Sequence, residues 1–161
     1  PSKFHYVFNL RDLSRVYQGL CLSLQESIAE PSALVRLWRN ECLRVFHDRL
    51  ISDEDRRILQ DDIIGKIVKD MWPSALSYVM ANPILYGDFR LANNPTESVR
   101  IYEDLGSYEA VRTIFDQTLS SYNSNGSTSS FMNLVLFQDA LEHLTRIHRI
   151  IRMERGNALL V

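Results

Sequence analysis

Apolar residues recur at helical spacing through the first part of the chain. Asn9 is a residue type that caps helix N-termini, and Asp12 follows three positions later, an arrangement typical of a capping box. The apolar positions that follow keep a period close to 3.6 residues: Leu10, Leu13, Val16, Tyr17, Leu20 and Leu24. This spacing predicts a first helix that begins at Asn9 and extends to about Leu24.

Two further helices are predicted before residue 70. The stretch Glu30-Pro31-Ser32 interrupts the first pattern, and a second apolar stripe then predicts a helix over about 33–50. Ser52 with Asp55 has the spacing of another capping box. It predicts a third helix that continues to about Lys69.

The pattern changes after the third helix. Pro73 and Pro83 interrupt it, and Gly87-Asp88 is typical of a turn. We therefore place a boundary near residue 82, which predicts two units, 1–82 and 83–161.

The second unit has one helix in 102–123, a polar loop at 124–130 and its clearest helical pattern in 131–152. Arg155-Gly156 is then typical of a turn, and the apolar run 157–161 predicts a buried strand. A short strand needs a partner for its backbone groups, so the partner strands are expected in a longer chain. The fold class predicted is mainly α, ending in one core β-strand.

Composition excludes several classes of protein. The chain has 161 residues, 45% of them hydrophobic and 24% charged, which is ordinary for a soluble globular protein. With 18 basic and 20 acidic residues the net charge is -2, so nothing favours nucleic acid or an anionic membrane as partner. No apolar run approaches a membrane span of about 20 residues. Cys21 and Cys42 lie within helical patterns and are predicted to be buried, reduced thiols.

Arg11 and Arg15 are the first candidates for chemistry. If Asn9 is the N-cap, Arg11 falls in the first helical turn and Arg15 one turn later on a shared face. Two arginines beside a helix N-terminus could bind a phosphate. The alternative is that both pair with Asp12, Glu26 or solvent. The residue types alone favour this alternative.

Other motifs are absent or ambiguous. The four histidines have no metal-ligand spacing, so packing or surface roles and no metal site are predicted. No G-x-S-x-G, H-E-x-x-H, C-x-x-C or G-x-x-x-x-G-K-[ST] motif is found, and the chain alone shows no complete catalytic apparatus. The stretch "NLVLF", residues 133–137, is either core packing or an apolar wall for a planar base, with the backbone of Val135 at the base edge.

Long stretches of the sequence closely resemble segments of axonemal dynein heavy chains, in the order of that family. They are "FHYVFNLRDLSRVYQG", "VRLWRNECLRVFHDRL" and "YNSNGSTSSFMNLVLFQDALEHLTRIHRIIRMERGNALLV". The resemblance implies that 1–82 is the helical lid of the third AAA+ module of the motor ring. It implies that 83–161 is the N-terminal segment of the fourth module, up to the strand before its Walker A loop. The chain is then expected to be a piece of a much longer one.

The resemblance also implies nucleotide-binding roles. Arg11 matches the sensor-two arginine of an AAA+ lid, which reaches phosphates held by the preceding large domain. Arg15 is a weaker candidate for support on the phosphate side. Three residues match the segment that lines the adenine pocket of the fourth module: Leu134, Val135 and Leu136. One departure is Asn40-Glu41, where many relatives carry His-Glu.

The function implied is that of a lid and linkage that couples nucleotide state between adjacent AAA+ modules of an ATP-driven microtubule motor. The segment alone is expected to be no enzyme and to hold no cofactor, whereas the parent would use ATP or ADP with Mg. Expected partners are the neighbouring AAA+ modules and, through the parent, microtubules. The expected location is the cytoplasmic cytoskeleton of the ciliary or flagellar axoneme. The alternative is a free-standing helical module that binds a partner helix in an apolar groove.

Overall fold

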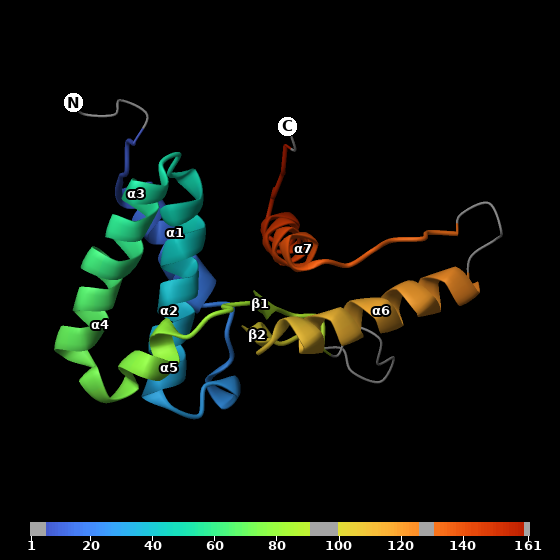
Figure 1. Cartoon of the computed structure of the whole chain (residues 1–161), viewed down its shortest axis with the longest axis horizontal. Coiled ribbons are helices and arrows are strands. Elements are labelled where there is room, and N and C mark those ends of the chain that lie inside the picture. The colour runs from blue at the N-terminus through green and yellow to red at the C-terminus, as the bar shows by residue number, and fades with distance from the viewer. Residues whose placement is uncertain (1–5, 91–99, 126–130, 160–161) are drawn as a thin grey trace. The chain divides into compact units, whose positions relative to one another are not determined.

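A computed structural model describes residues 6–90, 100–125 and 131–159 of the chain. The chain divides into two compact units, residues 1–82 and 83–161. Helices dominate both units, and the described part holds one short two-stranded sheet (Figure 1), which confirms the mainly helical fold class. That the two units are parts of successive AAA+ modules stays a prediction.

The first helix, α1, spans Leu10–Leu20 and begins with the predicted capping box. The side chain of Asn9 accepts from the backbone N–H groups of Arg11 and Asp12, and the Asp12 carboxylate accepts from the Asn9 N–H at 3.0 Å. The helix ends four residues earlier than predicted. The hydroxyl of Ser23 donates to the Leu20 carbonyl at 2.7 Å, so a local side-chain bond replaces a helical one. A short 3-10 turn, η1, follows at Gln25–Ser27.

The second helix, α2, spans Pro31–Val45, and a 3-10 turn, η2, follows at His47–Arg49. The helix begins two residues earlier than predicted, because Pro31 occupies its first turn, where the missing N–H costs nothing. Leu34, a member of the predicted apolar stripe, is 44% exposed. In its place α2 buries charged residues that the pattern did not indicate: Arg36, Arg39 and Glu41.

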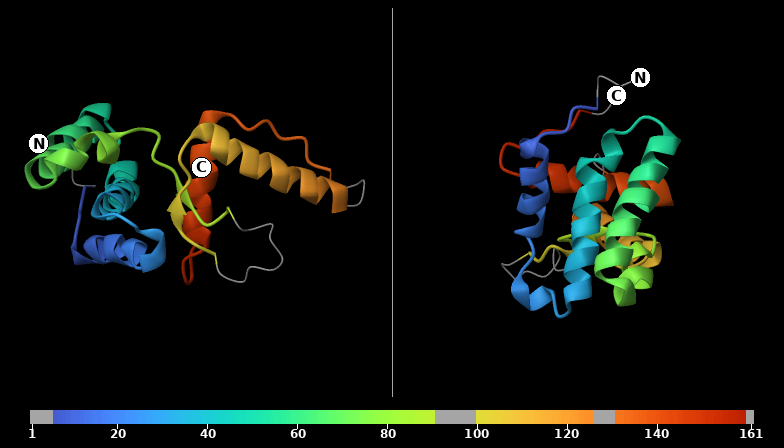
Figure 2. Two further views of the ribbon diagram at one scale, coloured as in Figure 1. Left: turned by 90° about the horizontal axis from the view of Figure 1, so that it is seen from below. Right: turned by 90° about the vertical axis from the view of Figure 1, so that its left-hand side faces the viewer.

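The third predicted helix is one helical stretch of three segments, in which a π-helix lies between two α-helices. It consists of α3 (Asp53–Arg57), the π-helix η3 (Ile58–Gly65) and α4 (Lys66–Met71). In a π-helix, residues five apart lie on one face, which brings Leu59 and Ile64 to the core together. Spacing in the sequence alone does not distinguish this geometry from an α-helix. The right-hand view of Figure 2 shows α2 between α1 and α4.

The first unit closes with a 3-10 turn, η4, at Pro73–Ala75 and a short helix, α5, at Leu76–Met80. α2 packs against both α1 and α5. The core lies between these helices and is formed by the buried residues Val16, Val35, Cys42, Val45, Ile64, Val68 and Val79.

The second unit contains strand β1 (Tyr86–Gly87), paired antiparallel with β2 (Glu103–Asp104), and two helices. Tyr86 is opposite Asp104, and Gly87 is opposite Glu103. Helix α6 spans Tyr108–Asn125 and α7 spans Gln138–Ile151. Its core consists of Leu85, Leu105, Val111 and Leu141, with Phe89, Tyr108, Ile114, Phe115 and Leu136 packed around them.

The helix predicted within 131–152 was wrong in its first seven residues, because α7 begins only at Gln138. Residues 131–137 are extended and run along α6 toward α7 (Figures 1 and 2). The amide of Asn123 bonds both backbone groups of Met132, at 2.8 and 2.9 Å, and so holds the start of this segment against the end of α6. The polar loop predicted at 124–130 lies mostly outside the described residues.

The strand predicted over 157–161 is not formed over its described part, 157–159. No described strand lies beside it, so its backbone groups have no ladder to join. Leu159 is 88% exposed. The last two residues of the predicted strand lie outside the described residues.

Candidate functional site

Arg11 lies in the first turn of α1, as the sequence predicts. Its backbone N–H donates to the Asn9 side chain at 2.9 Å, and its side chain is exposed. Within the described residues, its guanidinium makes no hydrogen bond or ion pair. A cation in a first turn opposes the helix dipole, so the position stabilises nothing within the chain itself. The guanidinium is available to an anion outside the chain.

Arg15 has a partner within the chain. Asp12 is buried, and its Oδ1 lies 2.9 Å from Arg49 Nη1 and 3.4 Å from Arg15 Nη1. The backbone hydrogen bond from Asn9 lowers the pKa of the Asp12 carboxyl, and the charges of Arg49 and Arg15 lower it further against the effect of burial. For Arg15 the structure therefore favours the pairing alternative.

Arg49 is the site residue that the sequence did not reveal. Besides Asp12, it donates to the Val7 carbonyl at 3.1 Å, and its guanidinium lies 4.9 Å from the centre of the Phe8 ring. It therefore fastens the segment before α1 to the start of that helix. The sequence held no local signal for this role, because Arg49 lies 37 residues from Asp12.

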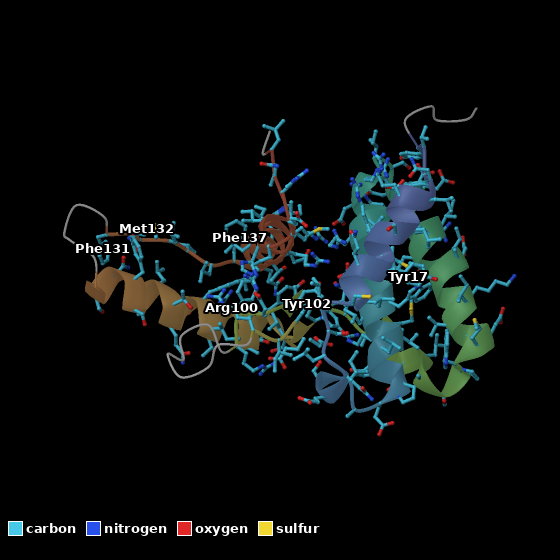
Figure 3. All side chains as sticks on the ribbon, turned by 180° about the vertical axis from the view of Figure 1, so that it is seen from behind. Tyr17, Arg100, Tyr102, Phe131, Met132 and Phe137 are labelled. Carbon is cyan, nitrogen blue, oxygen red and sulfur yellow. The ribbon has the colours of Figure 1, made fainter. Side chains whose placement is uncertain are left out.

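A different face of α1 from the one that carries Arg11 and Arg15 is apolar and exposed. Leu10 is 84% exposed, Leu13 44% and Tyr17 60%. Their spacing places them on one face of the helix; Figure 3 labels Tyr17 on it. The first unit thus presents, on one helix, a cation with no partner among the described residues and an exposed apolar face, a combination that suits contact with another protein surface that holds an anion.

The other predicted site segment lies in the second unit. Leu134 is 55% exposed and Val135 81% exposed, so both can line a pocket completed by other residues. Leu136 is half-buried and packs against the core of its own unit. Figure 3 shows Phe131 and Met132 beside one end of α6 and Phe137 beside α7, the two ends of this extended segment.

An apolar pocket of about 380 Å³ lies in the first unit and was not predicted. Residues from three separate parts of the chain line it: Tyr6, Phe8, Phe46, Leu50, Asp55, Ile58, Leu59 and Ile63. The Tyr6 hydroxyl donates to the Asp55 carboxylate at 2.9 Å and accepts from the Ile51 N–H at 2.8 Å. These bonds occupy the Tyr6 hydroxyl, and most of the other lining residues are apolar.

Both cysteines were predicted to be buried, and the structure buries one of them. Cys42 is buried, and burial, with the nearby Glu41 carboxylate, raises the pKa of its thiol to about 12. Cys21 was wrongly predicted to be buried: it is the C-cap of α1, where the chain leaves the core, and it is exposed. Among the described residues no group of His, Cys, Asp and Glu is placed to hold a metal ion. The described helices include none long and apolar enough to cross a membrane.

Two family models match the chain in the order of its two units. The model of the AAA+ lid domain matches residues 1–76. The model of the P-loop containing dynein motor region D4 matches residues 132–161. The first match covers the helices that carry Arg11, and the second covers the segment with Leu134, Val135 and Leu136.

Curated relatives match over the whole chain. It is 55% identical over 161 residues to dynein axonemal heavy chain 10 of Homo sapiens, and this match covers 4% of that protein. It is 45% identical over 166 residues to the dynein-1-alpha heavy chain of the flagellar inner arm I1 complex of Chlamydomonas reinhardtii, again 4% of that protein. The dynein beta chain of the flagellar outer arm of the same organism is 40% identical and is covered over 3% of its length. The chain therefore belongs to the family of axonemal dynein heavy chains, and it spans a small part of their length.

Proposed function

We propose that this chain is the lid of the third AAA+ module and the start of the fourth in the motor ring of a ciliary or flagellar dynein heavy chain. The parent would be an ATPase that moves along microtubules in the cytoplasmic cytoskeleton of the axoneme. The observation that carries the proposal is Arg11: an exposed guanidinium in the first turn of a capped helix that also has an exposed apolar face.

In this proposal Arg11 binds the phosphates of a nucleotide held by the preceding large domain. The capping box fixes the turn that carries it. Asp12 is the nearest carboxylate in sequence, but its Oδ1 already pairs with Arg49 and Arg15. Since Asp12 is committed, it does not neutralise Arg11. The exposed face of Leu10, Leu13 and Tyr17 would pack against the same large domain.

A second group of arginines supports a linkage role. Arg36 donates to the carbonyls of Tyr78 and Ala81 at 2.9 and 2.8 Å. Arg39 donates to those of Val79 and Ala81 and to the Asn82 side chain, at 3.0, 3.1 and 2.9 Å. Both are buried on α2, so the last residues of the first unit are fastened to its central helix. A rotation of the lid would then be passed on to the chain that follows as a rigid-body motion.

The second unit would contribute to a different nucleotide site, in the fourth module. Leu134 and Val135 would form part of the wall around adenine, and residues 157–161 would form the strand before the phosphate-binding loop. The match of residues 132–161 to the P-loop containing dynein motor region D4 supports this assignment. ATP or ADP with Mg would be bound with residues of the rest of the parent. Because phosphoryl transfer needs a Walker loop, a magnesium ligand and a positioned water together, the 161 residues alone would hydrolyse nothing.

The test replaces Arg11 by Ala in the intact heavy-chain motor. Loss of a charge-assisted phosphate contact should weaken nucleotide affinity at the third module by about 10- to 100-fold. Arg57→Ala is the control, since Arg57 is also an exposed arginine on a helix of the first unit, at the last residue of α3. Nucleotide-dependent release from microtubules should be impaired in the Arg11 variant and normal in the control. Equal affinity and equal release in the two variants would refute the proposal.

A further inference from the structure

Asp88 joins the sheet of the second unit to the end of α7. It follows β1 directly and is 7% exposed. Its Oδ1 lies 2.5 Å from His148 Nε2, and its Oδ2 lies 3.0 Å from Arg152 Nε. His148 and Arg152 are one helical turn apart, and Arg152 is the C-cap of α7. Both carboxylate oxygens therefore hold the last turn of that helix.

The neighbouring residues restrict this contact further. The ring of Phe89 lies 4.3 Å from the His148 ring, measured between centroids. Phe89 also packs edge to face with Phe115 on α6, at 4.9 Å. His148 is thus held between an aromatic ring and a carboxylate, which leaves the end of α7 little freedom to rotate.

The chain leaves α7 through a tight turn with a fixed backbone path. Arg155 has a φ of 57°, in the left-handed region, and the Gly156 N–H donates to the Met153 carbonyl at 2.9 Å. A Cβ on Gly156 would lie 1.8 Å from the Ile150 carbonyl oxygen, so only glycine fits. Because this turn is built on the last turn of α7, the orientation of that turn sets the direction of residues 157–159.

A buried carboxylate is a costly way to hold a helix. Leu141 is fully buried and already anchors the first half of α7 in the core. Apolar residues could hold the second half at no desolvation cost, whereas a carboxylate with two directed bonds defines an orientation. The choice of Asp88 therefore indicates a need for defined geometry at the end of α7.

We propose that Asp88 is a positioning residue for the nucleotide site of the fourth module. Through His148 and Arg152 it fixes the end of α7, and through the exit turn it sets the direction of residues 157–159, which the proposed function assigns to the strand before the phosphate-binding loop. This inference rests on the proposed function, because that function places a phosphate-binding loop after residue 161. Asp88 itself would touch no nucleotide.

The test measures binding of a fluorescent ADP analogue to the intact heavy-chain motor whose other nucleotide sites are inactivated. Asp88→Asn and His148→Leu should weaken binding by about tenfold, the effect expected if the misplaced loop loses one charge-assisted hydrogen bond to the nucleotide. His148→Gln keeps an N–H donor toward Asp88, so its affinity should stay close to that of the wild type. Asp116→Asn is the matched control, the same chemical change on the exposed surface of α6.

A second readout separates positioning from simple loss of structure. Hydrogen exchange should accelerate at the amides of Met153 and Gly156 in Asp88→Asn and stay unchanged at Leu141. The inference is overturned if Asp88→Asn binds like the wild type, if His148→Gln is as weak as His148→Leu, or if exchange rises equally at Leu141. If the wild-type motor binds no nucleotide at this site, the proposed function fails instead.

Discussion

Gly19 and Glu41 pack so closely that no side chain fits between them. A Cβ at Gly19 would lie 1.9 Å from Glu41 Oε2. Glu41 is fully buried and cannot easily move away, because its Oε2 accepts from Arg44 Nε at 2.9 Å and lies 2.8 Å from Arg44 Nη2. The absence of a side chain at Gly19 thus allows α1, which carries Arg11, to lie against α2.

Gly19→Ala should therefore destabilise the chain, even though alanine is the better helix former. Overpacking against a buried ion pair should lower the free energy of unfolding by about 2–4 kcal/mol. Gly65→Ala is the control, because its Cβ would meet only ordinary contacts, the nearest at 3.4 Å. Urea denaturation of the purified chain measures both. Equal stability of the two variants would show that α1 and α2 do not pack as closely as described.

Arg39 should be irreplaceable by lysine. Its guanidinium donates to two backbone carbonyls and one side-chain amide oxygen. A lysine ammonium has a single nitrogen, so it cannot donate to all three oxygens from the positions of the two guanidinium nitrogens. Burial, together with the charge of Arg36, lowers the pKa of Arg39 to about 10, so it remains charged at neutral pH. Arg39→Lys and Arg39→Ala should each cost about 3 kcal/mol, because the oxygens would lose their donors.

Hydrogen exchange and urea denaturation together check the Arg39 prediction. Exchange at the amides of Val79 to Asn82 should accelerate more than exchange elsewhere in the first unit. A lysine variant as stable as the wild type would show that charge alone, without the fork geometry, holds the end of α5.

The ion pairs of Asp12 predict how the stability of the chain changes as the pH falls. Its pKa is lowered from 3.8, so the stability that the carboxylate contributes is fully present above pH 3.8 and is lost as pH falls through the lower folded-state pKa. Asp12→Asn should be less stable than the wild type at pH 7, and the difference should vanish in acid. Urea denaturation of both proteins between pH 7 and pH 2 measures it. A difference that does not change with pH would refute the ion pairs with Arg49 and Arg15.

The two thiols should react at very different rates. Cys21 is exposed, whereas Cys42 is buried with a pKa raised to about 12, so almost no Cys42 thiolate exists at neutral pH. Iodoacetamide followed by mass spectrometry should find Cys21 alkylated in the native chain and Cys42 alkylated only after denaturation. Comparable labelling of both in the native chain would contradict the packing of α2 in the core.

The sequence was enough to predict that helices form. It was not enough to predict where a helix begins or ends when distant residues decide this. The capping box at Asn9 and Asp12 is a local pattern, and it was right. The error at residues 131–137 arose because their apolar residues also fit a helical period. What decides the conformation there is Asn123, which binds Met132 from nine positions away.

The roles of several buried charged residues could not be predicted from the sequence. Arg39 was given no role, Glu41 was noted only in a departure from relatives, and Asp88 was taken as part of a turn, yet each is buried. Arg39 and Asp88 bond residues 40 and 60 positions away, in contacts that form only when distant segments meet, whereas Glu41 bonds Arg44 on its own helix. The role proposed for Arg11 rests on the resemblance to a family, because the phosphate that it would bind lies outside the chain.

The structure of the intact heavy-chain motor with nucleotide bound in the third module would show whether Arg11 contacts the phosphates there. We expect a guanidinium nitrogen of Arg11 within about 3 Å of a phosphate oxygen, the distance of a charge-assisted hydrogen bond. Arg15 and Arg49 should remain on Asp12. An Arg11 side chain that points into solvent, with the phosphates beyond its reach in every nucleotide state, would refute the role proposed for Arg11.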